Sequence, residues 1–439
     1  MQFNRLKVAQ FNTFPYGGAA TAATRLHKQL RKFEVASQFF FHRNEKSDLG
    51  DMSYKQLEFP EPRYTKIAGA MQKRLDRRRQ KGIYQQYNDH IALRAPGEET
   101  FSMAQLPNPT ELDWNAIDAD VIHLHWISFF VDYSSFFGSI PNEVPIVWTL
   151  HDMNAFTGGC HYANDCTRFK YGCGGCPQVT NSSRNDVSAS TFRVKQKSLR
   201  HKNINVVTPS DWMRELAVRS KIWPEQTTFQ TIRLGFDLKE FQPIAKSAAR
   251  QELGIGEDSV LIAFGAEDIN NRRKGLQHLM PALADLTTAK SVECVVFGSG
   301  EIESIGNLPK IHHFGYVDSA RKQSMIYSAA DLVVVPSRED NQPQVGLEAM
   351  ACGTPVVAFN AGGIPEYVRD GITGLIAKHG DERSLAERIS WLVNHSEARL
   401  KMGQRARYMM EREFELGQQS RAYLNLYQNA ISNRQLKAA

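Results

Sequence analysis

The segment Asp331–Leu375 constrains the fold more than any other part of this 439-residue chain. The apolar run Leu332–Val335 ends at a proline, as a buried parallel strand does. A second apolar run, Pro355–Phe359, ends at a glycine-containing turn. Between them, Val345–Cys352 favours a helix, with Gly353 placed to cap its end. Two strand ends and the start of a helix are therefore expected at one edge of a parallel sheet.

Acidic and flexible residues are concentrated at that edge. Asp340 falls in the loop after the first strand, and Glu348 falls in the first turns of the helix. Gly362 and Gly363 form the turn after the second strand. Carboxylates bind hydroxyls, and the backbone N–H groups of a helix N-terminus bind anions. The predicted crevice therefore suits a ligand that carries both hydroxyls and phosphates.

Strand and helix patterns alternate through the rest of the chain, which predicts an α/β fold with parallel sheets. The mixed-polarity segment 235–245 is interpreted as a hinge. We therefore expect an N-terminal domain over 1–235 with a cysteine-rich loop at 158–178, and a C-terminal domain over 236–412. The last residues, 413–439, are expected to form a helix that packs back on the first domain. The predicted strands of the two domains are Leu6–Phe11, Val121–His125, Ile146–Leu150, Ile204–Thr208, Phe229–Leu234, Val260–Gly265, Val292–Gly300 and His313–Val317.

The opening segment also carries a family signature. Glu348–Val357 reads EAMACGTPVV, and Gly362–Glu366 reads GGIPE. This segment resembles the donor-binding region of retaining glycosyltransferases of family 4, which have the GT-B fold of two Rossmann-like domains facing a cleft. The family carries two glutamates eight positions apart, whereas here Asp340 takes the first position, beside Glu339. This variant resembles a subfamily that acts in exopolysaccharide and colanic-acid-type assembly.

The resemblance implies roles for individual residues of the second domain. Asp340 would hold hydroxyls of the donor sugar, and Glu348 would hold the ribose. The donor phosphates would lie against the first turn of the helix, at Val345 and Gly346. The nucleotide base would be held at Tyr316 and Val317, mainly through backbone groups.

Two cations are expected to neutralise the donor diphosphate. Lys274 fits the family's Lys-Gly position. The arginine that the family places directly after the glycine of the first strand is absent, because Ala266 stands there. Arg273, or its neighbour Arg272, is the candidate substitute. The alternative for the whole group is a basic surface loop.

The first domain is expected to supply the acceptor side. Gly17 and Gly18 follow the first strand and open a helix, where glycines let backbone N–H groups approach a bound phosphate or hydroxyl. The resemblance implies that this loop borders the reaction centre, so both are expected among the donor-binding residues; a tight strand-to-helix turn would also need glycine. His151 ends another strand, and the family places a histidine there beside the donor sugar and the acceptor hydroxyl. His123 and His125 end the neighbouring strand and share one of its faces. Each histidine could instead be structural, and His151 ranks first.

Four cysteines lie close together in the first domain. Cys160, Cys166, Cys173 and Cys176 include the C-x2-C step of zinc loops, with His161 as a reserve ligand. We expect a structural zinc site, because a reducing cytosol disfavours disulfides. Unmetallated thiols in a surface loop are the alternative. Asp118-Ala119-Asp120 spells a D-x-D but precedes a strand, so no catalytic metal is expected.

Charge and hydropathy suggest where the protein acts. The net charge is only +6, but Lys73 to Lys81 carries six positive charges against one negative. With apolar residues before it, segment 67–81 could form a basic amphipathic helix for an anionic membrane, or a solvated surface helix. No aromatic interleaving points to nucleic acid. No apolar run approaches the ~20 residues of a membrane span, and the N-terminus reads as a strand. These features predict a cytoplasmic protein, either free or peripheral at the inner face of the membrane.

Together these features predict a retaining glycosyltransferase that moves a sugar from a nucleotide-diphosphate sugar to a saccharide or lipid-linked acceptor. No side chain is placed as a covalent nucleophile, and the family favours same-face attack with the departing phosphate taking the proton. Two alternatives stay open. One is a hydrolysing sugar-nucleotide epimerase with the same fold, and the other is a non-catalytic nucleotide-sugar-binding protein.

Overall fold

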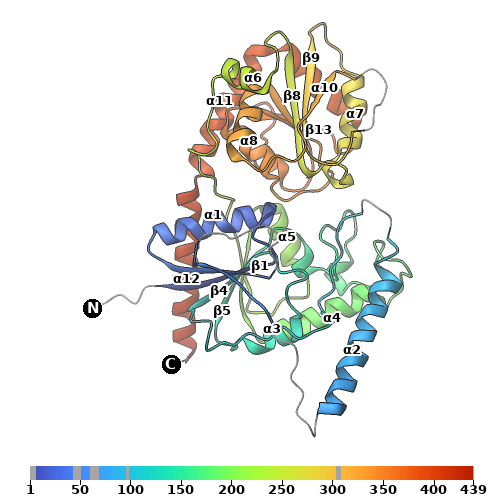
Figure 1. The fold of residues 1–439 in the computed structure, drawn as a ribbon, viewed down its shortest axis with the longest axis vertical. Helices are drawn as coiled ribbons and strands as arrows, with labels where there is room; N and C mark the ends of the chain where they lie inside the picture. The colour runs from blue at the N-terminus through green and yellow to red at the C-terminus, as the bar shows by residue number, and fades with distance from the viewer. Residues whose placement is uncertain (1–5, 43–50, 60–68, 95–97, 303–307, 439) are drawn as a thin grey trace. The chain divides into compact units, whose positions relative to one another are not determined.

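In a computed structural model, the chain divides into two compact units (Figure 1). Unit 1 comprises Met1–Pro209, Met213–Ile232 and Ser420–Ala439, and unit 2 comprises Ser210–Trp212 and Arg233–Gln419. The structure describes residues 6–42, 51–59, 69–94, 98–302 and 308–438.

Unit 1 is built on a parallel sheet. Within the described residues this sheet has seven strands in the order β3-β2-β1-β4-β5-β6-β7. Each neighbouring pair runs parallel, so the strands end at the same edge. The strands are β1 Lys7–Asn12, β2 Ala36–Phe41, β3 Tyr54–Gln56, β4 Val121–Leu124, β5 Pro145–Thr149, β6 Asn203–Thr208 and β7 Thr228–Thr231.

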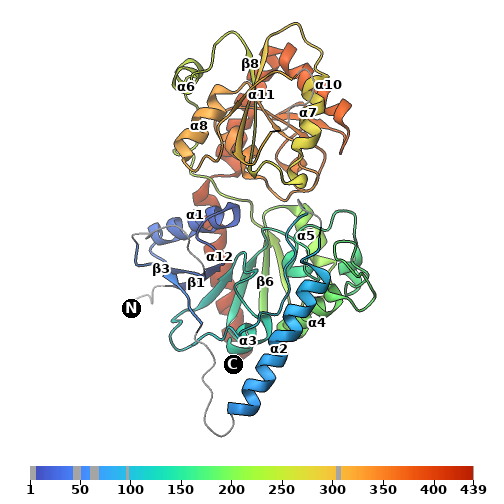
Figure 2. The same cartoon turned by 45° about the vertical axis from the view of Figure 1, so that its right-hand side comes forward.

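Helices cover this sheet, and the C-terminal helix supplies part of the core. Tyr423 and Tyr427 are fully buried against Val8 of β1 and Val121 of β4. The long helix α2 lies on the outside of the unit and exposes most of its side chains (Figure 2). The helices are α1 Gly18–Lys32, α2 Gly69–His90, α3 Tyr133–Ser139, α4 Val187–Leu199, α5 Asp211–Val218 and α12 Leu416–Ala438, with short 3-10 turns at Asn154–Phe156 and Arg168–Tyr171.

Unit 2 holds a second parallel sheet. Its described strands follow the order β10-β9-β8-β11-β12-β13. They are β8 Val260–Asp268, β9 Val292–Ser299, β10 Lys310–His313, β11 Leu332–Val335, β12 Val356–Phe359 and β13 Gly374–Ala377. The helices are α6 Lys246–Leu253, α7 Leu276–Ala284, α8 Ala320–Ala329, α9 Gln344–Ala351, α10 Glu382–Asn394 and α11 Ser396–Glu413, with 3-10 turns at Arg272–Lys274 and Ile364–Glu366.

The prediction of two α/β domains with parallel sheets is confirmed. The buried strand β11 has the predicted bounds because its four residues are all apolar and fully enclosed. The predicted strand at His313–Val317 is wrong, since β10 ends at His313 and Tyr316 lies beyond it. Segment 67–81 is helical from Gly69, and Ile67 and Ala68 lie outside the described residues.

None of the helices in the described part of the chain combines the length and the apolar character that a membrane span requires.

Candidate functional site

The polar segments of unit 2 lie after two neighbouring strands. β11 is an uninterrupted buried run, and the chain leaves it through a loop to Pro343, the N-cap of α9. β8 is the sheet neighbour of β11 and leads into the 3-10 turn Arg272–Lys274. Because parallel strands end at the same edge, these two loops meet there. The backbone bond from Arg338 N to the carbonyl of Arg273, 2.8 Å long, joins them directly.

Asp340 is the centre of this meeting point. Its Oδ2 accepts hydrogen bonds from Arg273 Nη1 at 2.8 Å and from Lys274 Nζ at 2.7 Å, and its Oδ1 accepts from the backbone of Asn341 at 3.0 Å. Burial alone would raise the pKa of this carboxyl. The ammonium of Lys274 and the guanidinium of Arg273 outweigh burial and lower the pKa of Asp340 to about 2. The site therefore holds a buried carboxylate between two cations.

Glycines allow the neighbouring turns to press against this loop. Gly275 has φ +83°, and a Cβ there would lie 1.9 Å from the carbonyl oxygen of Pro336. Gly362 has φ +58°, and a Cβ there would lie 1.9 Å from the carbonyl oxygen of Asp340. Both positions therefore exclude any side chain. Gly363 fixes the same backbone by donating its N–H to the Asp340 carbonyl at 2.9 Å.

The start of α9 places the second acid. Glu348 is buried, and its Oε2 accepts a hydrogen bond from the hydroxyl of Tyr327 at 3.0 Å. Val345 and Gly346 lie in the first turn, the part of a helix whose backbone N–H groups bind anions in general, although the Gly346 N–H itself donates to the Pro343 carbonyl at 3.2 Å. Gly346 packs against Tyr367, since a Cβ there would lie 2.5 Å from the tyrosine hydroxyl oxygen. The helix thus presents an anion-binding end beside a fixed carboxylate.

Other predicted residues of unit 2 lie apart from this group. Arg272 is exposed, whereas its neighbour Arg273 pairs with Asp340, so the structure brings Arg273 rather than Arg272 to the acid. Tyr316 is about half exposed, and Val317 is buried with its carbonyl bonded to Gln323 Nε2 at 3.0 Å. Both follow the edge strand β10, which β9 separates from β8. They belong to the same sheet edge but not to the Asp340 cluster.

The predicted residues of unit 1 follow three neighbouring strands. Gly17, with φ +88°, caps α1 after β1, and Gly18 is the first residue of that helix. His125 follows β4 and His151 follows β5, and the two rings meet with 3.2 Å between His125 Nδ1 and His151 Nε2. His123 is enclosed in the core, where it contacts Tyr427 at 2.7 Å. Of the two other histidines, His151 therefore contacts His125, whereas His123 packs in the core against Tyr427.

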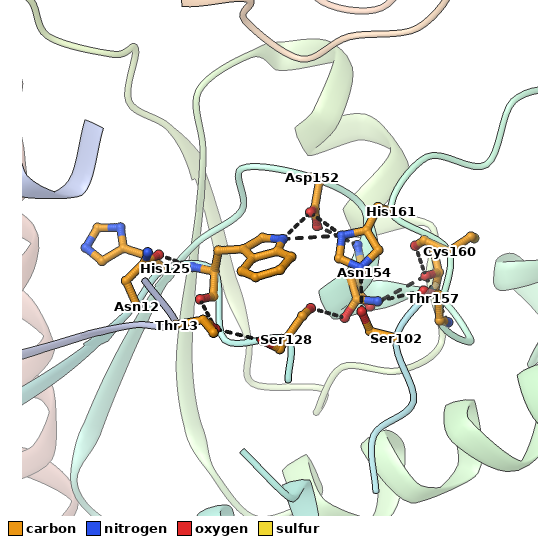
Figure 3. A network of polar contacts seen from close by, with 12 residues as sticks. Asn12, Thr13, Ser102, His125, Ser128, Asp152, Asn154, Thr157, Cys160 and His161 are labelled. Carbon is orange, nitrogen blue, oxygen red and sulfur yellow. Dashed lines mark hydrogen bonds and ion pairs between the residues drawn. The ribbon is translucent and has the colours of Figure 1, made fainter. Parts of the chain in front are cut away.

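Sequence reasoning missed a polar network at the end of β5 (Figure 3). Asp152 Oδ2 accepts hydrogen bonds from Trp126 Nε1 at 2.7 Å and from His161 Nδ1 at 2.6 Å, and Ser102 Oγ meets His161 Nε2 at 2.7 Å. Both ring nitrogens of His161 are engaged in this network, and its role as a reserve zinc ligand stays a prediction. The sequence signal that could have revealed this network is Asp152, the acidic residue directly after His151. The network anchors the cysteine-rich loop to the strand end that carries His151.

The four clustered cysteines line one small cavity of about 10 Å³ as free thiols. Burial raises the pKa of Cys173 to about 12 and the pKa of Cys160 further. Four thiols suit Zn²⁺ as ligands. However, among the residues that the structure describes, no group of three or more His, Cys, Asp or Glu is arranged to hold a metal ion. The zinc site stays a prediction.

Comparison with known structures agrees with this architecture. Sucrose-phosphate synthase from Thermosynechococcus elongatus superposes with a TM-score of 0.66 at 17% identity, covering 98% of this chain and 100% of the other. WaaG, a glycosyltransferase involved in lipopolysaccharide biosynthesis, gives 0.61 at 15%, with 96% and 99% covered. HepE from Anabaena, solved in complex with UDP-glucose, gives 0.60 at 16%, with 96% and 100% covered. The chain has the GT-B fold of two parallel-sheet α/β domains.

Sequence comparison adds a family match. Residues 246–409 match the family model described as glycosyl transferases group 1. A protein of Escherichia coli (strain K12) named for colanic acid biosynthesis, the glycosyl transferase WcaC, is 25% identical over 97% of this chain and 100% of its own length. D-inositol 3-phosphate glycosyltransferases of Saccharomonospora viridis and Segniliparus rotundus are 29% and 35% identical over 46% and 36% of this chain. Those two matches span only 50% and 38% of the relatives' length.

Proposed function

We propose that this protein is a retaining glycosyltransferase that moves a sugar from a nucleotide-diphosphate sugar to a saccharide or lipid-linked acceptor in cell-surface polysaccharide synthesis. The buried Asp340 between Arg273 and Lys274, inside the matched domain, carries the proposal. The UDP-glucose complex of HepE supports the donor class, and the names of WcaC and WaaG support the polysaccharide role.

The donor is assigned to unit 2. Lys274 and Arg273 take the diphosphate, because two cations in a partly buried site stabilise both the bound anion and the charge that develops on the leaving group. The first turn of α9, at Val345 and Gly346, is assigned to the same anion site. Glu348 accepts hydrogen bonds from ribose hydroxyls. Tyr316 and Val317 are assigned to the base.

Asp340 is assigned to the sugar itself. An ionised carboxylate is an acceptor only, so it binds hydroxyl groups of the transferred sugar. Its very low pKa keeps it ionised at any working pH. Oδ2 of Asp340 bonds both Arg273 and Lys274, so this carboxylate couples the binding of the diphosphate to the position of the sugar.

The reaction step needs no enzyme nucleophile. The acceptor oxygen forms a bond to the anomeric carbon on the face from which the nucleoside diphosphate departs, and the bond from that carbon to the β-phosphate oxygen breaks. Because attack and departure use the same face, the anomeric configuration is kept, and the acceptor proton passes to the departing phosphate oxygen. His151 positions the acceptor sugar beside the donor, and Gly17 and Gly18 border the reaction centre and bind the donor.

Two further features are proposed for unit 1. The four cysteines of the loop are proposed to bind one structural zinc ion, which the shared cavity and the thiol chemistry support. Helix α2 is proposed to contact anionic membranes, because the exposed apolar residues Met71 and Leu75 lie on the same helix as a cluster of exposed basic residues. The wild-type protein should co-sediment with vesicles of anionic lipid, whereas an Arg74→Glu/Arg77→Glu variant should not. Equal co-sedimentation of the two proteins would refute the membrane contact. The basic residues of the exposed part of α2 are Lys73, Arg74, Arg77, Arg78 and Lys81.

A donor screen tests the proposed function. Isothermal titration with a panel of nucleotide-diphosphate sugars should find at least one ligand, and nucleoside diphosphate should be released only when an acceptor saccharide is added. Release without acceptor would favour an epimerase or hydrolase. Binding of a nucleotide-diphosphate sugar without release of nucleoside diphosphate, whichever acceptor is added, would indicate a non-catalytic binding protein.

A further inference from the structure

A row of polar side chains crosses the core of unit 1. Three of its members are buried: Ser37 of β2, Gln10 of β1 and His125 just after β4. The next member, His151, lies just after the end of β5, the neighbouring strand of the sheet. Burying a polar group is costly unless it is hydrogen-bonded, so an unbroken polar row in a sheet core calls for an explanation. His27 of α1, fully enclosed, joins the row from the covering helix.

Each member bonds to the next. Ser37 Oγ meets His27 Nδ1 at 2.8 Å and accepts from Gln10 Nε2 at 2.8 Å. Gln10 Oε1 meets His125 Nε2 at 3.0 Å. His125 Nδ1 meets His151 Nε2 at 3.2 Å. The row therefore runs without a gap from α1 to the end of β5.

The outer end of the row is tied to a charged pair. His27 Nε2 meets Ser53 Oγ at 3.0 Å, and Ser53 Oγ donates to Asp51 Oδ1 at 2.8 Å. Arg31 donates to Asp51 Oδ2 at 2.5 Å and to Ser53 Oγ at 2.8 Å. An ionised carboxylate only accepts, so the single hydroxyl proton of Ser53 points at Asp51. Ser53 must therefore accept from His27.

The donor and acceptor of each hydrogen bond further along the row then follow by elimination. With Nε2 as its donor, a neutral His27 accepts at Nδ1, so Ser37 donates to it and accepts from the amide of Gln10. The carbonyl oxygen of Gln10 then faces His125, which donates from Nε2 and accepts at Nδ1. The remaining donor at the last contact is Nε2 of His151.

The elimination holds only if the imidazoles are neutral. Burial lowers the pKa of His27 and of His151 to about 4, and it lowers the pKa of His125 well below the ordinary histidine range. At neutral pH each ring therefore carries one proton, and one nitrogen must accept.

We propose that the row Asp51–Ser53–His27–Ser37–Gln10–His125 fixes His151 in its Nε2–H tautomer, so that Nδ1 carries the lone pair of the ring. The members of the row are positioning residues, since they act through His151. The amide of Gln10 interrupts any simple proton relay, so the row transmits hydrogen-bond direction rather than protons. Asp51, on the surface side of the unit, thus determines which nitrogen of a distant histidine can accept.

The consequence for catalysis rests on the role of His151 proposed above. A hydroxyl of the acceptor sugar, other than the attacking one whose proton passes to the departing phosphate, can donate to a ring nitrogen only where the lone pair lies. A histidine that exchanged between tautomers would offer the wrong nitrogen for part of the time. The competent fraction of the enzyme, and with it kcat, would fall in proportion.

Nitrogen-15 NMR of histidine-labelled full-length protein tests the tautomer directly. Two-bond proton–nitrogen correlations should show His151 as a single Nε2–H tautomer at neutral pH. Ser37→Ala removes the hydroxyl that orients Gln10, and Gln10→Met removes the amide. Either change should produce both tautomers of His151. The variant Thr149→Val is the matched control, because it removes a buried partner of His123 at 2.8 Å outside the row and should leave His151 unchanged.

The outcomes separate the row from the proposed function. A wild-type His151 in the Nδ1–H form, or an unchanged His151 in both Ser37→Ala and Gln10→Met, would overturn the row. If the tautomers become about equally populated, kcat should fall about twofold with little change in KM for the donor. A tautomer shift with an unchanged kcat would uphold the row and overturn the role of His151 in transfer.

Discussion

Lys274 donates from Nζ to Oδ2 of Asp340 at 2.7 Å, across 66 residues of sequence. Arg273 shares the same oxygen at 2.8 Å. The two cations assigned to the donor diphosphate are therefore already held by the acid assigned to the donor sugar. An incoming diphosphate has to compete with that carboxylate for both cations.

This competition leads to an asymmetric prediction for Asp340→Asn. The amide cannot hold the two cations as a carboxylate does, so the affinity for free nucleoside diphosphate should rise roughly tenfold. The rate of sugar transfer should fall, because a carboxylate that binds the sugar is lost. Calorimetry with nucleoside diphosphate and a transfer assay measure the two effects. A variant that bound nucleoside diphosphate more weakly than wild type would contradict the competition.

The ion pairs also make a prediction for stability against pH. The pKa of Asp340 is lowered from 3.8 to about 2 in the folded protein. A lowered folded-state pKa stabilises the fold above pH ~4, and this contribution of about 2 kcal/mol is lost as the pH falls toward 2. Denaturant unfolding of unit 2 at several acidic pH values should show this loss. The slope over this pH range should be shallower in Asp340→Asn, and an identical slope would show that the pairs do not lower that pKa.

The sequence could predict some parts of this cluster and not others. β11 was recognisable because four consecutive apolar residues mark a strand buried on both faces. The sequence could not decide between Arg272 and Arg273. That choice depends on how the 3-10 turn after β8 faces the loop after β11, the strand next to β8 in the sheet. β2 was missed, and with it Ser37. The row to His151 likewise depends on strand order, since Gln10 and His125 lie 115 residues apart.

Neighbouring basic residues provide a matched test of the diphosphate assignment. Lys274→Ala should weaken binding of nucleoside diphosphate by about ten- to a hundredfold, since it removes a charge-assisted hydrogen bond in a partly buried site. Arg272→Ala removes the same charge from an exposed position in the same turn and should change binding by less than about threefold. Calorimetry with nucleoside diphosphate compares them. Equal losses in the two variants would point to a general electrostatic effect rather than a specific contact.

The cysteine-rich loop makes a prediction that does not depend on activity. Elemental analysis of protein purified without chelators should give about one zinc per chain, since four cysteine thiolates are the full ligand set of a structural zinc site. Cys173→Ser/Cys176→Ser should lose the metal, whereas Cys294→Ala, at a buried core cysteine outside the loop, should keep it. Wild-type protein without zinc would leave the four residues as plain thiols.

The central claim is that the group around Asp340 and Glu348 binds a nucleotide-diphosphate sugar for transfer with retention. Its most direct measurement is mass spectrometry and proton NMR of a lipid-linked saccharide incubated with the donor that the screen selects. The wild-type protein should add one sugar with the anomeric configuration of the donor, and Glu348→Ala should lose most of this product while keeping the fold. An inverted linkage, or undiminished product from Glu348→Ala, would contradict the account.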